Sequence, residues 1–441
     1  MANRKIPAMV PVFFFFFIVL TACTLTTNDG NNSGDNSINI IKVSAKDLIA
    51  PVSEQNPVTK NVADGANDFA FSLGAELLKD SGNANFVCSP FSAWLPLAAL
   101  VNATASPYKD ALVSALGASG ISETDINRTA SRMLYNLTDY QNKNDKDYYN
   151  PLKIANAIFV DNNVTLRKDF AQTYMDYFRG SSINVDFSSP SAADAVNRWA
   201  SQNTNGLIKE IIKEFDPSTV AAIANAIYYA DKWSWKFDSD DTKDGIFYSP
   251  NGETTAHYML REGGSQGYYE DDMVQAMPLY FKHGGVLYII LPRAGDASEF
   301  LASMTNDYFK EIARNTQRAE GKLLLPRFSI GCDFDSLAKT LTALGIPLFD
   351  EASAPLSGGL IEEGIPVYLS SARQKALINV DEEGTTAAAV TVMSAATSTG
   401  SPPQPEIPFE MICNRPFVFI LCDNTYDGGN QILFTGVVNR P

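Results

Sequence analysis

Histidine is almost missing from this sequence. Only His257 and His283 occur among 441 residues. Histidine is the side chain best suited to moving protons near neutral pH, and it is a common ligand of zinc. Two isolated histidines are poor material for His-centred catalysis or a His-rich metal site. We therefore expect no enzyme activity, no bound metal and no cofactor.

Long basic runs are missing as well. The chain has 34 basic and 50 acidic residues, which gives it a formal net charge of −16. Nucleic acids bind to positively charged surfaces, so we expect no nucleic-acid partner. The hydrophobic content of 45% over this length is enough for a large buried core. We expect a globular protein.

Cysteine is scarce, and no two cysteines have the close spacing of metal ligands. Four of the five, Cys88, Cys332, Cys413 and Cys422, lie in or beside apolar runs. Buried free thiols are the default at such positions. An exported protein would permit disulfides, but the sequence does not choose among the possible pairings.

A single long apolar run stands near the amino terminus. Arg4 and Lys5 precede the run Ala8–Leu20, which contains five consecutive phenylalanines and is short for a membrane-spanning helix. The run leads into Leu20-Thr21-Ala22-Cys23, which resembles a bacterial lipobox. We expect residues 1–22 to be a lipoprotein-type signal peptide that is removed before a lipid-modified Cys23. An ordinary secretory signal is the alternative.

Both alternatives place the protein outside the cytoplasm, either held on the cell surface by lipid chains or secreted. Residues 23–61 are rich in Asn, Ser, Thr and Gly, and we expect them to be a disordered tether. No linker divides residues 62–441, where helical patterns come first and strand patterns follow. This order predicts one α+β domain. Two of its expected strands are Val367–Val380 and Phe409–Leu421.

The segment between those two strands combines two patterns. It is dominated by Ala, Thr, Ser and Gly, a composition typical of a flexible linker. Its small residues also alternate, so that Thr385, Ala387 and Ala389 would share one face of a strand, and proline is absent until Pro402. The segment can therefore be a loop or a central strand. Gly384 at its root would let the backbone swing between the two states.

Motifs spread along the chain identify its family. In chain order they are Asn85–Ser92, Val196–Trp199, Thr204–Ile208, Asn225–Trp233, Leu325–Phe328, Leu341–Ile346, Asn414–Phe419 and Phe434–Asn439. Together with the alternating segment Glu382–Ala389, they make residues 62–441 resemble a serpin. The resemblance implies three β-sheets with about nine helices. It also implies an exposed reactive loop, here about residues 382–408, held away from a five-stranded sheet.

The resemblance further implies a monomeric suicide inhibitor of serine proteases. A protease attacks the loop and forms a covalent acyl-enzyme complex. The cleaved loop then inserts into the sheet as a new strand and distorts the protease before it can deacylate. A non-inhibitory serpin that acts as a surface binding module is the alternative. Heparin activation is not expected, because the basic residues between Glu123 and Asp147 are diluted by acidic ones.

The family's functional positions form three sets. The hinge comprises Glu382, Glu383, Gly384, Thr385, Ala387, Ala388 and Ala389. The shutter, under the point where the sheet opens, comprises Ser89, Ser92, Asn225 and Gln374. Trp233 matches the breach, where insertion begins. Inward-facing hinge residues must be small, because a charge or a proline there would stall insertion, and Thr385 and Ala387 meet that demand.

The scissile bond is placed by counting from the hinge. In the family it lies about seventeen positions from the first hinge glutamate, and an arm of that length crosses the sheet at about 3.3 Å per residue. The count gives Ser398 followed by Thr399, and a proline-rich insertion before Asn414 leaves the position open by a few residues. No charged or aromatic residue lies between Gly384 and Gln404. The expected targets are therefore elastase-like or subtilisin-like proteases that prefer small residues.

Overall fold

The computed structural model describes residues 12–22, 57–138, 151–385, 407–423 and 430–441. These ranges contain nine α-helices and three β-sheets, so the expected α+β architecture is confirmed. The helices are α1 (Pro57–Leu78), α2 (Pro90–Leu100), α3 (Tyr108–Ala115), α4 (Glu123–Thr138), α5 (Lys168–Phe178), α6 (Pro190–Asn203), α7 (Ala297–Ser303), α8 (Asn306–Arg314) and α9 (Ala338–Ala343).

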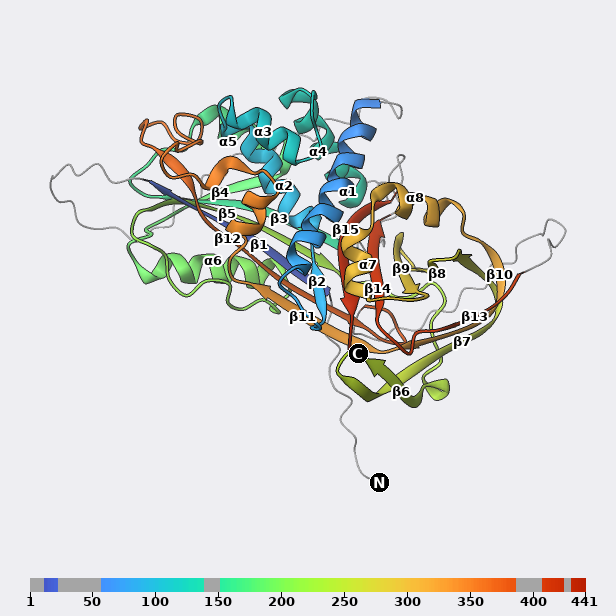
Figure 1. Cartoon of the computed structure of the whole chain (residues 1–441). Coiled ribbons are helices and arrows are strands. Elements are labelled where there is room, and N and C mark those ends of the chain that lie inside the picture. The colour runs from blue at the N-terminus through green and yellow to red at the C-terminus, as the bar shows by residue number, and fades with distance from the viewer. Residues whose placement is uncertain (1–11, 23–56, 139–150, 386–406, 424–429) are drawn as a thin grey trace, which may run out of the picture.

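Sheet A is the surface on which the candidate site is built. Its strands, from one edge to the other, are β11 (Phe328–Phe334), β12 (Val367–Val380), β1 (Val12–Ala22), β5 (Thr219–Tyr229), β3 (Leu152–Asp161) and β4 (Gly180–Val185). The strand β12 has the bounds expected from the sequence. Figure 1 shows these long strands lying side by side, with α6 on one side of them and α2 to α5 on the other.

The six strands correct the expectation of a five-stranded sheet. The sixth strand is β1, the phenylalanine-rich run near the amino terminus, which pairs antiparallel with β12 and with β5. The backbone of this run is enclosed by a ladder on each side, and its aromatic and β-branched residues favour extended backbone. The segment expected to be a targeting signal alone therefore also forms a structural element. The described part of the expected reactive loop ends at Thr385, so the sixth strand is β1 and not the loop.

Sheet B and sheet C share the long strand β7 (Gly252–Glu270). Sheet B contains β2 (Phe86–Cys88), β15 (Gln431–Val438), β14 (Phe417–Asp423), β9 (Gly285–Pro292), β8 (Val274–Tyr280) and the end of β7. Sheet C contains β13 (Ile407–Ile412), β10 (Gln317–Pro326), β7 and β6 (Lys243–Ser249). The single strand expected at Phe409–Leu421 is thus two strands that belong to different sheets.

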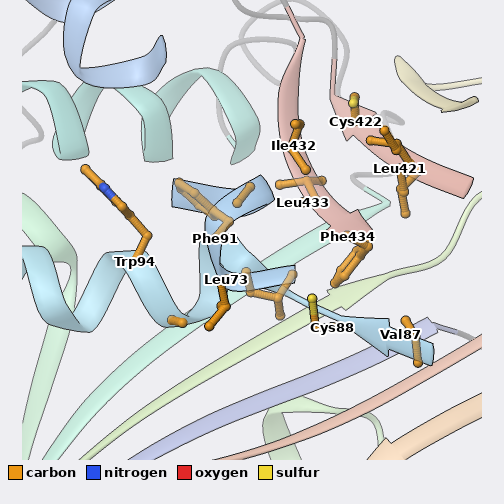
Figure 2. Close-up of a cluster of buried hydrophobic side chains, with 14 of the residues drawn as sticks. Leu73, Val87, Cys88, Phe91, Trp94, Leu421, Cys422, Ile432, Leu433 and Phe434 are labelled. Atoms are coloured by element: carbon orange, nitrogen blue, oxygen red, sulfur yellow. The ribbon is translucent and has the colours of Figure 1, made fainter. Parts of the chain in front are cut away.

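The strand β5 separates two cores. Its side chains alternate: Ile223 and Ile227 lie in the large core with α2, whereas Ala222 and Ala224 lie in a smaller core with α6. Burial on both faces explains why this strand is apolar at nearly every position. The large core continues under α1 and α2, where Figure 2 shows Leu73 and Phe91 between Trp94 on one side and Leu433 and Phe434 of β15 on the other.

Candidate functional site

The described root of the expected reactive loop, Asp381–Thr385, is bonded to the segment that follows β5. Gly384 forms an antiparallel bridge with Lys232. The Thr385 N–H donates to the Asp231 carbonyl oxygen at 2.8 Å, and the Trp233 N–H donates to the Glu383 carbonyl oxygen at 3.0 Å. Thr385 is fully buried. The root therefore already runs alongside the end of β5 in the direction that a new strand of sheet A would take.

Gly384 allows this close approach. Its φ is 139°, and a Cβ built at this position would lie 2.3 Å from the Asp231 carbonyl oxygen. Any other residue would meet both a disfavoured backbone angle and a direct overlap with the backbone. The residue expected to be a flexible hinge is therefore, in this structure, also a contact point between two backbones.

Glu382 is buried beneath the root and holds it to sheet C. Its carboxylate forms an ion pair with Arg327 and accepts a hydrogen bond from the Thr242 hydroxyl. The Arg327 Nε also donates to Glu382 Oε1 at 2.7 Å. The neighbouring Glu383 is more exposed and lies 3.6 Å from the Lys236 ammonium. Sequence reasoning missed Arg327 and Thr242, because both are far from Glu382 in the chain.

Trp233, which the family resemblance assigns to the breach, lies just after β5 and beside the root. Its indole N–H donates to the Asp381 carbonyl oxygen at 2.8 Å. Its ring stacks on Phe281, with the ring centroids 4.3 Å apart. The side chain is buried. Trp233 thus combines core packing with a direct hydrogen bond to the base of the loop.

Asp381, at the end of β12, is titratable in the acid range. Burial raises the pKa of its carboxyl group to about 6, the hydrogen bond from the Glu383 N–H opposes the shift, and the neighbouring Glu382 charge adds to it. Its Oδ1 accepts that N–H at 3.0 Å. The turn that begins the loop therefore gains one further negative charge, at Asp381, as the pH rises through about 6.

The expected shutter residues lie in two hydrogen-bonded groups under the middle of sheet A. In the first group, the Ser92 hydroxyl of α2 donates to Asn225 of β5. Asn225 Nδ2 donates to Asn156 Oδ1 of β3 at 2.7 Å, and Asn156 Nδ2 donates to the Phe178 carbonyl oxygen at 2.7 Å. Sequence reasoning missed Asn156, whose part in the chain becomes visible only when β3 is paired with β5.

The second group joins β12 to the start of α2. Gln374 Nε2 donates to the Ser89 carbonyl oxygen at 2.9 Å, and its Oε1 accepts from the Ser89 N–H at 3.1 Å. The Ser89 hydroxyl donates to the Leu433 carbonyl oxygen at 2.9 Å. Gln374 and Ser89 are fully buried. The glutamine amide thus satisfies one donor and one acceptor at once.

The strand β1 passes between the two groups. Phe16 is opposite Asn225 on one side and opposite Gln374 on the other. The two polar groups therefore lie on opposite sides of the central strand β1. Other predicted site positions, namely Cys23, Ala387, Ala388, Ala389, Ser398 and Thr399, lie outside the described residues.

Asp231 is a further buried carboxylate next to the root, and sequence reasoning did not single it out. It accepts from the His283 N–H at 2.8 Å, and its Oδ1 lies 2.7 Å from His283 Nδ1. Its backbone N–H donates to the Thr385 hydroxyl at 3.1 Å. This Asp–His pair holds the β8–β9 turn against the end of β5, and so it acts in positioning the breach.

One motif typical of hydrolases occurs in the chain, but its serine lies within a strand. A Gly-x-Ser-x-Gly match, which sequence reasoning missed, occurs at Gly263–Gly267. Its Ser265 is exposed within β7 and pairs with Glu320 of β10, instead of standing on a strand-to-helix turn. No group of three or more His, Cys, Asp or Glu suited to a metal ion occurs in the part of the chain that the structure describes.

The four described cysteines are free thiols, as the sequence predicts. Burial raises the pKa of Cys88 and of Cys413 to about 12, so neither thiol is reactive near neutral pH. Cys88 lies in the core shown in Figure 2, with its sulfur 3.3 Å from the Thr435 hydroxyl. Among the described helices, none is long and apolar enough to cross a membrane.

Comparison with known proteins agrees with this architecture. The family model described as serpin, serine protease inhibitor, matches residues 64–441. The mouse protein alpha-1-antitrypsin 1-4 is 28% identical over 393 residues, which is 88% of this chain and 91% of the relative.

Two solved structures show the same fold. The native state of tengpin, a thermophilic serpin, has a TM-score of 0.74 at 25% identity and covers 92% of this chain and 100% of its own. Human thyroxine-binding globulin has a TM-score of 0.72 at 24% identity and covers 87% of this chain and 99% of its own. The sheet order, the loop root and the family match together show that the chain belongs to the serpin family of protease inhibitors.

Proposed function

We propose that this serpin inhibits elastase-like or subtilisin-like serine proteases by inserting its cleaved reactive loop into sheet A. One observation carries the proposal: the buried Thr385 is already paired beside Asp231, so the loop begins at the entrance of the sheet. A strand that continued from Thr385 would carry small residues into a packed interior.

The protease supplies the catalytic groups for the reaction at the loop. Its serine Oγ bonds to the carbonyl carbon of Ser398, and the bond from that carbon to the Thr399 nitrogen breaks as the protease histidine protonates the leaving amine. The ester that remains is normally hydrolysed with the help of the oxyanion hole. Insertion of the loop displaces the attached protease and distorts that hole, so the ester persists.

The loop sequence sets the target class. Small residues around Ser398 suit a shallow primary pocket, whereas a trypsin-like pocket needs a Lys or Arg that residues 385–404 do not contain. The test uses the chain that begins at residue 23, the expected mature form, mixed with pancreatic elastase, subtilisin or trypsin. Denaturing gels should show a covalent complex with elastase or subtilisin and little with trypsin. Complete loop cleavage without a covalent band from either of the first two enzymes would contradict the proposal.

We also propose where and in what form the inhibitor acts. The mature protein is exported and acts as a monomer, anchored through a lipid on Cys23 or released, and it needs no heparin. The apolar run followed by Leu20-Thr21-Ala22-Cys23 supports the anchor. Mass spectrometry of the amino-terminal peptide from the membrane fraction should find a diacylated Cys23. An unmodified peptide that begins elsewhere would favour an ordinary secretory signal.

One observation favours the alternative, a binding module. A cavity of about 250 Å³ lies between α1, α8 and the strands β9 and β15. Two buried amide oxygens at the cavity, those of Asn306 and Gln431, have no hydrogen-bond partner in the structure. Phe309 and Tyr288 supply aromatic surface, and Arg314 lies in the lining. The cavity suits an aromatic anion that carries an N–H or O–H donor.

The fluorescent aromatic sulfonate anilinonaphthalene sulfonate is a suitable probe for this alternative, because it combines rings, an anion and an N–H. Saturable one-to-one binding that weakens severalfold in Arg314→Ala, but not in the exposed control Arg318→Ala, would support the binding module. Absent saturation, or equal binding by both variants, would leave inhibition as the function.

A further inference from the structure

The amino-terminal strand β1 occupies the gap of sheet A into which the cleaved loop would insert. On one side Val12, Phe16 and Leu20 are opposite Tyr229, Asn225 and Ala221 of β5. On the other side β1 follows β12 from Leu377 to Val367. A strand enclosed by ladders on both sides leaves no open edge to which another strand could be added.

The position of β1 also matches the register that the loop would adopt. Gly384 is opposite Lys232, so a ladder continued residue by residue would bring position 387 opposite Tyr229. That place is held by Val12. By the same count position 391 would fall opposite Asn225, where Phe16 lies. An inserted loop would run in the same direction as β1 and would need the same neighbours, so insertion of the loop and occupancy by β1 exclude each other.

The sequence of the leader suits this role. Every residue from Val12 to Leu20 is apolar, and the strand contains no charge and no proline after its start. Such a run is unfavourable in water and is stabilised by enclosure between two strands of a packed sheet.

We propose that the amino-terminal segment 12–22 is an internal competitor of the reactive loop, and that it keeps the unprocessed chain unable to trap proteases. The proposal rests on the proposed function, since only a serpin that inserts its loop can be blocked in this way. β1 ends at Ala22, immediately before the bond at which the leader is expected to be removed. Removal of the leader would therefore both complete export and free the gap, so that inhibitory activity appears only after processing.

The experiment compares full chains that retain residues 1–22, made without export and checked by intact mass. In Phe15→Pro/Phe17→Pro, two backbone donors of β1 are lost, which a central strand does not tolerate. The matched control Phe15→Leu/Phe17→Leu keeps both donors and the apolar character. Each chain is mixed with subtilisin and with pancreatic elastase. The readouts are the covalent complex on denaturing gels and, before protease is added, hydrogen exchange of the β5 and β12 amides.

We expect the unmodified chain and the leucine control to be cleaved in the loop with little covalent complex. The proline variant should form at least tenfold more complex and exchange its β5 and β12 amides faster. Equal complex formation by the unmodified chain and the proline variant would overturn the inference, as would equal exchange. If exchange differs but neither that variant nor the chain beginning at residue 23 traps a protease, the proposed function fails while occupancy of the gap by β1 is confirmed.

Discussion

Gly384 lies opposite Lys232 in an antiparallel bridge, at the point where the loop leaves β12 and meets the end of β5. The bridge brings two backbones so close that a Cβ on residue 384 would lie 2.3 Å from the Asp231 carbonyl oxygen. The entrance of sheet A therefore depends on one residue without a side chain. Several consequences of this arrangement can be measured in the chain that begins at residue 23.

Gly384→Ala should weaken the loop root. The new methyl group meets backbone atoms, and φ of 139° is unfavourable for alanine, so we expect a loss of about 1–3 kcal/mol in the free energy of unfolding. Urea unfolding followed by tryptophan fluorescence measures the loss. Gly358→Ala is the matched control, since Gly358 has φ of 73° but nothing within 4 Å of the built Cβ. Equal losses in the two variants would show that close approach at 384 costs nothing beyond backbone strain.

Arg327→Ala should destabilise the fold by about 1–3 kcal/mol, because it leaves the buried Glu382 carboxylate without its charged partner. The figure is below that for a fully buried pair, since the Arg327 side chain is 43% exposed. The exposed pair Arg293–Glu270 provides the control, and Arg293→Ala should cost less than about 1 kcal/mol. Chemical denaturation of both variants checks the difference, and an Arg327→Ala chain as stable as Arg293→Ala would contradict the role given to Glu382.

Gln374→Leu should destabilise the fold, although it changes only one side chain of the long strand β12. The leucine is of similar size, but the buried Ser89 N–H and carbonyl oxygen both lose their partner, at a cost of about 2 kcal/mol or more. Thermal unfolding would measure this loss of stability, and loop-cleavage assays would show whether the loop is affected as well. Gln172→Leu, on the exposed face of α5, removes only a surface hydrogen bond to Asp176 and should change stability little. A harmless Gln374→Leu substitution would show that the amide does not hold β12 to α2.

Asp381 should make stability depend on pH in a defined direction. Its pKa is raised to about 6 in the folded protein, so the folded state holds a proton that the unfolded state releases at lower pH. The stability that the protonated Asp381 carboxyl group contributes is fully present below about pH 4 and is lost as the pH rises towards 6. Above pH 6 the stability no longer changes through this group. Asp381→Asn keeps an oxygen that can accept the Glu383 N–H. The melting temperature of this variant should match the wild type near pH 4 and exceed it at pH 7, and an unchanged difference across that range would contradict the assignment.

The sequence predicts some of these elements better than others, for physical reasons. The strand β12 could be predicted with its bounds, because residues 367–380 form one continuous strand-like run. The strands β13 and β14 were merged into one expected strand, Phe409–Leu421, although Asn414 and Pro416 interrupt that run and could have separated them. The strand β1 could not be predicted, because an apolar run fits a secretory leader and a buried strand equally well.

The residues of the candidate site could also be predicted only in part. Local patterns and family motifs singled out Gly384, Thr385 and Gln374; in the structure Gly384 pairs with Lys232 and Gln374 lies on β12. Partners from distant segments were missed, among them Arg327, which is 55 residues from Glu382, and Asn156, which is 69 residues from Asn225. No periodicity in one segment reveals a side chain that arrives from another.

A protease that cuts the loop of this serpin should stay attached to it. Mass spectrometry of the chain beginning at residue 23, after reaction with subtilisin or pancreatic elastase, tests this directly beside the variants Thr385→Arg and Thr385→Val. For the wild type and Thr385→Val, we expect a covalent complex and a released fragment that begins near Thr399. For Thr385→Arg we expect cleavage without a complex, since the charge would be buried at a fully enclosed position. Wild-type chain that is cleaved near Ser398 and released free of protease would show that the loop is a substrate and not a trap.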